Sequence, residues 1–388
     1  MMRVCFVFKK RIAGLLAFAV LARMSAFAGV WSWTGAQDSY WTNAANWKID
    51  GAAASVPPGM YCIENGGNAG AFDSAVEFGE VADGCATAIN LDGFWDVSNV
   101  VIKASAPRYQ FGTSDAQSFT IHSTAGVFRV ESGAPAPRIV AKFGAWRYAG
   151  VSGGNLGDSF VPKLVNDSVE TLELPKMFYV ESSAKSGEKA FRFEGCGDVK
   201  ISGLCTCYSL IYLDLAQTDG AKLIWNCSVR DWNISGIRKI RNASGTVSEI
   251  QLTENGVLSG YTGMGPFEIA GSLTLSGKGE YVCNVGEKKD TIAKDGNKYQ
   301  DQQNSVGGEM HVQCKVTSAE NGGYYGGWTL YGGGGTTWFD GAIDNQMKGA
   351  AKILPSGDWL STQYILVPHM AYIRSATLEV GFSASRKW

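Results

Sequence analysis

Short apolar segments with a two-residue period recur along most of this chain, and they limit its fold more than any other feature. In such a segment, alternate side chains face the same side, which predicts a short β-strand with one buried face. Turn-forming residues separate the segments at intervals of about 8 to 12 residues. No long amphipathic helical pattern interrupts the series, so we predict an all-β protein. The segments include Val100/Ile102, Phe119/Ile121, Phe128/Val130, Phe191/Phe193, Val199/Ile201, Leu213/Leu215, Leu223/Trp225, Ile250/Leu252 and Leu273/Leu275.

Two architectures accommodate many short strands at this spacing. In a parallel β-solenoid (β-helix), each coil contributes about three short strands and contacts only its neighbours. The alternative is one or two β-sandwiches. The large number of consecutive strands favours the elongated solenoid. Composition agrees with β structure, since the chain has 49 Gly and only 18% charged residues, against about 25% in ordinary globular proteins.

The first 28 residues have the three parts of a secretory signal peptide. Arg3, Lys9, Lys10 and Arg11 are basic, Ile12 to Ala22 is apolar, and Ala26-Phe27-Ala28 is a cleavage site of the A-x-A type,. We therefore expect a secreted or cell-surface protein that begins at Gly29.

Removal of this segment makes the chain more acidic. It carries five Lys/Arg and no Asp/Glu, so the formal net charge changes from −2 to −7. An acidic chain argues against nucleic acid as a partner. No later apolar run has the roughly 18 residues of a transmembrane helix, so we predict none in the mature chain.

Four tryptophans, Trp31, Trp33, Trp41 and Trp47, open the expected mature chain. One interpretation is a cap, in which large rings cover the end of a β stack whose open edge would otherwise recruit other chains. The other is a platform on which the rings stack against sugars. We favour the cap because aromatic rings dominate packing wherever they can be buried.

The same stretch carries a family resemblance. Its pattern is W-x-G at Trp33–Gly35, W-x-x-x-x-N-W at Trp41–Trp47, and then Pro57. This pattern resembles the opening of secreted bacterial proteins with autotransporter-associated β-strand repeats, and Gly271–Gly277 resembles their repeat core. The resemblance implies a Gly-rich parallel β-solenoid on or outside the cell, and it implies little about activity. Family members often end in a membrane barrel or a sorting signal, and this chain shows neither clearly.

These observations divide the chain into five parts. They are a signal peptide at 1–28, a Trp-rich cap at 29–60, a β-solenoid body at 61–285, a polar loop at 286–309, and a C-terminal Gly- and aromatic-rich β segment at 310–388.

Catalytic patterns are scarce. The three histidines, His122, His311 and His369, are far apart and lack metal-site spacing,. There is no phosphate-binding loop. We therefore predict no metal and no cofactor.

One enzyme alternative stays open, a polysaccharide lyase or glycoside hydrolase on a β-helix. Such chemistry uses a pair of carboxylates, and residues about one coil apart lie about 4.8 Å apart in a stack. The candidates are Asp214, Asp219 and Asp231, with Arg230, Arg238 and Arg241 near enough in sequence to stabilise an anionic sugar.

A second alternative is a carbohydrate-binding module in the C-terminal part. Glycines alternate with aromatic residues between 321 and 335, and the candidate glycan-binding residues are Tyr324, Tyr325, Trp328 and, just beyond, Trp338.

Eight cysteines follow the signal segment, an even number that favours disulfides in an exported protein. Proximity suggests Cys62–Cys85, pairing among Cys196, Cys205, Cys207 and Cys227, and Cys283–Cys314. Buried free thiols are the alternative.

The sequence thus predicts an exported, non-enzymatic β-solenoid with a structural or adhesive role, whose partners are polysaccharides, cell-surface glycans or other surface proteins.

Overall fold

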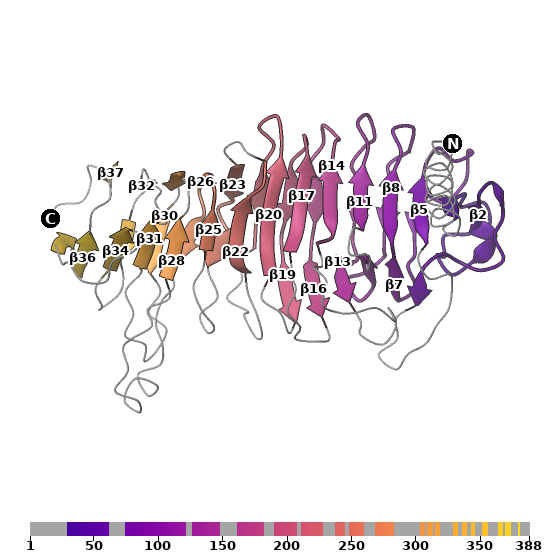
Figure 1. The fold of residues 1–388 in the computed structure, drawn as a ribbon. Helices are drawn as coiled ribbons and strands as arrows, with labels where there is room; N and C mark the ends of the chain where they lie inside the picture. The colour runs from indigo at the N-terminus through magenta and orange to yellow at the C-terminus, as the bar shows by residue number, and fades with distance from the viewer. Residues whose placement is uncertain are drawn as a thin grey trace, which may run out of the picture.

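A computed structural model gives the fold of the chain (Figure 1). It describes residues 29–61, 74–121, 126–147, 161–181, 190–207, 211–227, 237–244, 248–259 and 268–282, and after these only the backbone of strands between 303 and 380.

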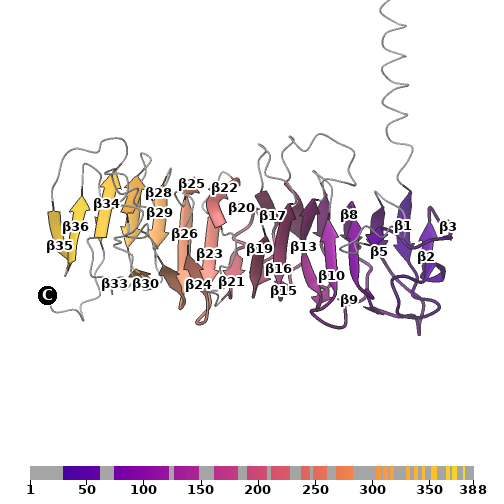
Figure 2. The ribbon, with the colours of Figure 1, turned by 90° about the horizontal axis from the view of Figure 1, so that it is seen from below.

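The chain coils into a parallel β-solenoid, as the sequence predicted, and not into sandwiches. A complete turn places one strand on each of three faces, and most of these strands pair in parallel with the corresponding strand of the next turn. The strand β5 (Ala75–Phe78) lies on face 1, β6 (Ala88–Ile89) on face 2 and β7 (Phe94–Val97) on face 3, and β8 (Asn99–Ile102) then pairs with β5. Five consecutive turns between Ala75 and Cys207 have this form. Figures 1 and 2 show the resulting elongated body, with β2 near one end and β36 near the other.

Face 1 is a single 16-stranded sheet in the order β3-β2-β1-β5-β8-β11-β14-β17-β20-β22-β25-β28-β31-β34-β36-β35. Its other strands are β1 (Val30–Trp33), β2 (Trp47–Ile49), β3 (Ala52–Ala53), β11 (Val127–Val130), β14 (Lys163–Asn166), β17 (Ala190–Gly195), β20 (Ile211–Gln217), β22 (Ile237–Asn242), β25 (Glu268–Ala270), β28 (Gln303–Val306), β31 (Thr329–Gly332), β34 (Ala351–Pro355), β35 (Tyr364–Val367) and β36 (His369–Ile373).

Faces 2 and 3 each comprise two sheets. Face 2 continues with β9 (Gln110–Phe111) and β12 (Arg138–Ile139), then β15 (Leu172–Leu174), β18 (Val199–Ile201), β21 (Leu223–Trp225), β23 (Ser248–Leu252), β26 (Leu273–Gly277), β29 (Glu309–Val312), β32 (Thr336–Phe339) and β37 (Glu379–Val380). Face 3 contains β4 (Met60–Tyr61), β10 (Ser118–Ile121), β13 (Lys142–Arg147), β16 (Met177–Glu181) and β19 (Leu204–Cys207), then β24 (Val257–Ser259), β27 (Glu280–Val282), β30 (Lys315–Ser318) and β33 (Ile343–Asn345).

The core forms because alternate strand residues point inward and stack on the same position of the next turn. On face 1, Phe128 pairs with Leu164, Leu164 with Phe193, and Phe193 with Leu215. All four side chains have no exposed surface. Every two-residue apolar pair given above is buried on both members, so the periodicity identified the inward positions correctly.

The tryptophan cluster is a cap, and the sugar-platform interpretation is wrong for it. Trp31, Trp33, Trp41 and Trp47 are each at most 4% exposed. Strand β1 pairs antiparallel with β2 and parallel with β5, so this cluster covers the first turn. Each of three indole N–H groups donates to a backbone carbonyl: Trp33 to Ala86, Trp41 to Pro58 and Trp47 to Trp41. These bonds satisfy the polar edge of rings that would otherwise be costly to bury.

The asparagine of the W-x-x-x-x-N-W motif organises the loop between the tryptophans. Asn46 is fully buried, its Oδ1 accepts from the backbone N–H groups of Gln37 and Asp38, and its Nδ2 donates to Asp38 Oδ1 at 2.6 Å. Desolvation raises the pKa of Asp38, but hydrogen bonds from Asn43, the Tyr40 backbone and Asn46 together bring it below the usual value. The only helical element in the described ranges is the 3-10 turn η1 (Ala44–Asn46), and no helix there could cross a membrane.

The C-terminal part continues the solenoid. Residues 303–306, expected within a polar loop, form β28, which pairs in parallel with β25. The parallel pairs β28–β31 and β31–β34 then extend face 1 through the segment expected to be separate.

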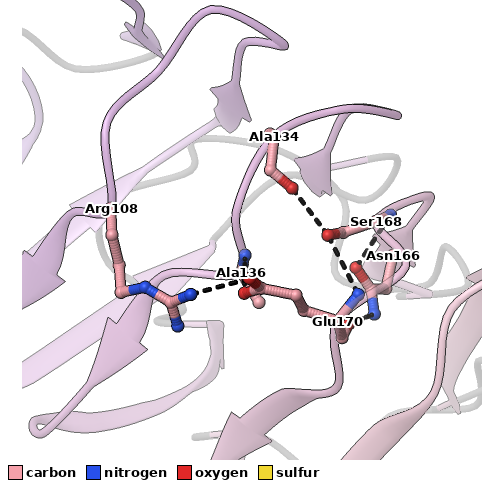
Figure 3. Close-up of polar contacts among 6 residues, drawn as sticks. All are labelled: Arg108, Ala134, Ala136, Asn166, Ser168 and Glu170. Carbon is pink, nitrogen blue, oxygen red and sulfur yellow. Dashed lines mark hydrogen bonds and ion pairs between the residues drawn. The ribbon is translucent and has the colours of Figure 1, made fainter.

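Polar side chains fasten successive turns together at the corner between faces 1 and 2 (Figure 3). The buried Asn166 ends β14, and its Nδ2 donates to the carbonyls of Glu170 and of Asp198 in the next turn. In the opposite direction, Glu170 accepts from the Ala136 backbone N–H at 2.9 Å and from Arg108 Nη2 at 2.7 Å. Ser168 Oγ donates to the Ala134 carbonyl at 2.6 Å. These contacts link the corners of four successive turns.

Replacing Glu170 with alanine should lower the free energy of unfolding by about 1–2 kcal/mol, because the backbone N–H of Ala136 loses its hydrogen-bond acceptor,. The Arg108 contact adds little, since that side chain is 58% exposed,. Glu173→Ala is the matched control, because Glu173 is 62% exposed and pairs with Lys200 on the surface. Urea unfolding followed by circular dichroism gives the free energy of unfolding of both variants. Equal losses would contradict a stabilising role for the Glu170 contacts.

Candidate functional site

A row of charged residues crosses the outer surface of face 1. Inward residues such as Leu164, Phe193 and Leu213 alternate with outward ones, and the register aligns the outward residues of neighbouring strands. Lys163 of β14 pairs with Arg192 of β17, Arg192 with Asp214 of β20, and Asp214 with Arg241 of β22. We call Lys163, Arg192, Asp214 and Arg241 the charged row. Neighbouring members are about 4.8 Å apart along the solenoid axis, the spacing of paired strands.

Asp214 and Arg241 form a two-pronged ion pair. Arg241 Nε donates to Asp214 Oδ1 at 2.5 Å, and Arg241 Nη2 donates to Asp214 Oδ2. The Asp214 side chain is 2% exposed and that of Arg241 is 27% exposed. The Arg241 guanidinium also lies 5.6 Å from the centre of the Tyr212 ring, within the range of a cation–π contact,. The carboxylate is therefore neutralised in place, which makes Asp214 a poor general base.

Glu194 lies between the other two cations of the charged row. Its Oε1 lies 3.2 Å from Lys163 Nζ and 2.7 Å from Arg192 Nε. The Arg192 N–H does not point at that oxygen, so the contact is ionic and Nε lacks a hydrogen bond. Sequence reasoning missed Lys163, Arg192 and Glu194, although their alternation with Leu164 and Phe193 placed them on the outer surface. The strand register that brings these residues to Asp214 could not be read from the sequence.

The predicted catalytic residues do not converge where the structure describes them. Asp219 lies in the exposed turn after β20, with a left-handed φ of 55°, and accepts from Thr218 Oγ1 at 3.4 Å. It thus shapes a turn, whereas Asp214 lies on a strand. Arg230 and Asp231 lie outside the described residues, and Arg238 is described by its backbone alone.

The predicted glycan-binding residues are only partly located. Tyr324, Tyr325 and Trp328 lie outside the described residues. Trp338 belongs to β32, where its backbone pairs with His311 of β29 and Glu379 of β37.

The cysteines whose side chains are described are free thiols, namely Cys85, Cys196 and Cys227. The expected disulfides to these three are therefore absent, a correction that includes Cys62–Cys85. Cys227 is 2% exposed, directs its thiol to the Ile201 carbonyl and packs as a small core residue. Burial raises its pKa to about 12. Cys205 and Cys207 lie on β19 with only their backbone described, and Cys62, Cys283 and Cys314 lie outside the described residues.

Among the described residues, no three His, Cys, Asp or Glu side chains gather into a group that could hold a metal ion. No protein-family model matches the chain, and comparisons with curated proteins and with solved structures found no match either. The likeness of Trp33–Gly35 and Trp41–Trp47 to autotransporter-associated repeats therefore stays a prediction.

Proposed function

We propose that this chain is an exported, non-enzymatic surface or extracellular protein with a structural or adhesive role. The observation that carries the non-enzymatic part is the Asp214–Arg241 pair. Asp214 is the candidate catalytic carboxylate on a strand surface, and its charge is already matched by a guanidinium. A glycosidase needs one carboxyl group to give up or take a proton beside the substrate, and a two-pronged ion pair opposes that exchange.

The architecture supports a structural role. Face 1 runs through sixteen strands from the capped end to β35, so the chain can display side chains along a long, regular surface. Export is supported by the signal-like segment at 1–28 and by the family-like pattern of the cap,.

We expect the purified chain to release no products from a panel of neutral and acidic polysaccharides. The measurement is the appearance of new reducing ends, together with absorbance of the unsaturated ends that a lyase would create. Turnover of any polysaccharide would overturn the proposal. Its loss in Asp214→Asn but not in Asp219→Asn would assign catalysis to the charged row.

A further inference from the structure

The guanidinium of Arg192 lies against Glu194, yet its N–H donors are not all hydrogen-bonded within the described part of the chain. Only its Nε approaches a carboxylate, that of Glu194 at 2.7 Å, and this contact lacks hydrogen-bond geometry. Within the part of the chain that the structure describes, Nη1 and Nη2 of Arg192 make no polar contact, and the side chain is 34% exposed. The planar fork of a guanidinium is suited to bind a carboxylate through two parallel hydrogen bonds. About a third of the Arg192 side chain is exposed, so a ligand can approach it.

Among the described residues, the charged row and Glu194 together hold three cations and two carboxylates. Asp214 is matched by Arg241, whereas Glu194 alone is shared between Lys163 and Arg192. An excess cation at this position stands out in a chain whose expected mature form has a net charge of −7, from −2 after loss of five basic residues.

The direction of the charged row indicates the shape of a ligand. Lys163 and Arg192 lie on adjacent strands, and Arg241 lies two strands beyond Arg192, all on the outer surface of face 1. The row therefore follows the solenoid axis for three strand spacings of about 4.8 Å each. Tyr212, partly exposed beside Arg241, adds an aromatic surface of the kind that packs against sugar rings. A ligand that places a negative group on Arg192 and a sugar ring against Tyr212 must extend across neighbouring strands, which a single small anion cannot do.

We propose that the charged row binds a linear acidic polysaccharide, with Arg192 as the main carboxylate-binding residue and Lys163 and Arg241 flanking it. The inference deepens the proposed extracellular role and rests on it, because an exported chain meets such polymers outside the cell.

The test measures binding of the full chain to polygalacturonate by affinity electrophoresis at low and high salt, with uncharged dextran and single-stranded DNA in parallel. We expect retention by polygalacturonate alone, weakening as salt rises. Arg192→Gln should weaken retention about tenfold, which corresponds to about 1.4 kcal/mol. Arg138→Gln is the matched control, since it removes one positive charge from an exposed residue of β12 on face 2. It should change retention by less than about twofold.

Three outcomes would overturn the inference: no retention at low salt, equal weakening by Arg192→Gln and Arg138→Gln, or equal affinity for DNA. Circular dichroism melting of both variants verifies that they are folded. Lys163→Gln provides a second test of the row if Arg192→Gln unfolds. New reducing ends in the same mixtures would refute the non-enzymatic function. They would not contradict binding of the polysaccharide at the charged row. If the unchanged chain is not retained and releases no new reducing ends, the binding site is refuted and the structural role is not.

Discussion

Trp41→Ala is expected to lower the free energy of unfolding by about 3–5 kcal/mol, the range for removing a large buried ring. Trp41 has no exposed surface and lies at the centre of the cap. Its ring centre is 4.6 Å from that of Trp47, 5.3 Å from Phe119 and 6.0 Å from Trp95. Its indole N–H also donates to the Pro58 carbonyl. Alanine would thus leave a cavity and an unsatisfied carbonyl at the same place.

The loss should begin at the N-terminal end, because each turn of a solenoid contacts only its neighbours. Limited proteolysis of Trp41→Ala should therefore cleave the first turns before the rest. Tyr40→Ala is the matched control, since the adjacent Tyr40 is 45% exposed, and it should cost no more than about 0.5 kcal/mol. Urea unfolding followed by circular dichroism gives both values. Similar costs for the two variants would refute the cap.

Arg241→Met is expected to cost about 3–5 kcal/mol, because it removes the two-pronged ion pair that compensates the buried carboxylate of Asp214,. The cost comes from burying that carboxylate with less compensation and not from the loss of attraction alone. Replacing both partners, as Asp214→Leu with Arg241→Met, should therefore restore much of the stability lost by Arg241→Met.

Arg129→Met serves as the matched control for this pair. Arg129 lies on the same outer surface, is 46% exposed, and is 3.7 Å from Asp167. An exposed pair at that distance contributes at most about 1 kcal/mol. Urea unfolding of these three variants and the unchanged chain measures each cost. If the double variant is as unstable as Arg241→Met, the carboxylate is not the source of the cost.

The core of this protein was predictable because it depends on local pattern. A strand alternates its side chains with a period of two, so pairs such as Phe191/Phe193 and Ile250/Leu252 identified inward positions without knowledge of their neighbours. The cap was predictable for a similar reason, since four large rings within a short stretch can hardly all stay in water. The disulfides were not predictable, because an even number of cysteines does not say whether any two of them meet.

The sequence by itself determined the short strands, their buried faces and the capped end, since these follow from the order of apolar, polar and turn residues. Only the tertiary structure decided the charged row. Asp214 and Arg241 are 27 residues apart, and their meeting depends on how much chain each coil uses before it returns to face 1. Along the row, Lys163 and Arg192 are 29 residues apart (192 − 163), Arg192 and Asp214 are 22 apart (214 − 192), and Asp214 and Arg241 are 27 apart (241 − 214). With coils of unequal length, no fixed sequence period shows which outward side chains become neighbours. Backbone pairing between the turns determines that register, and with it the site.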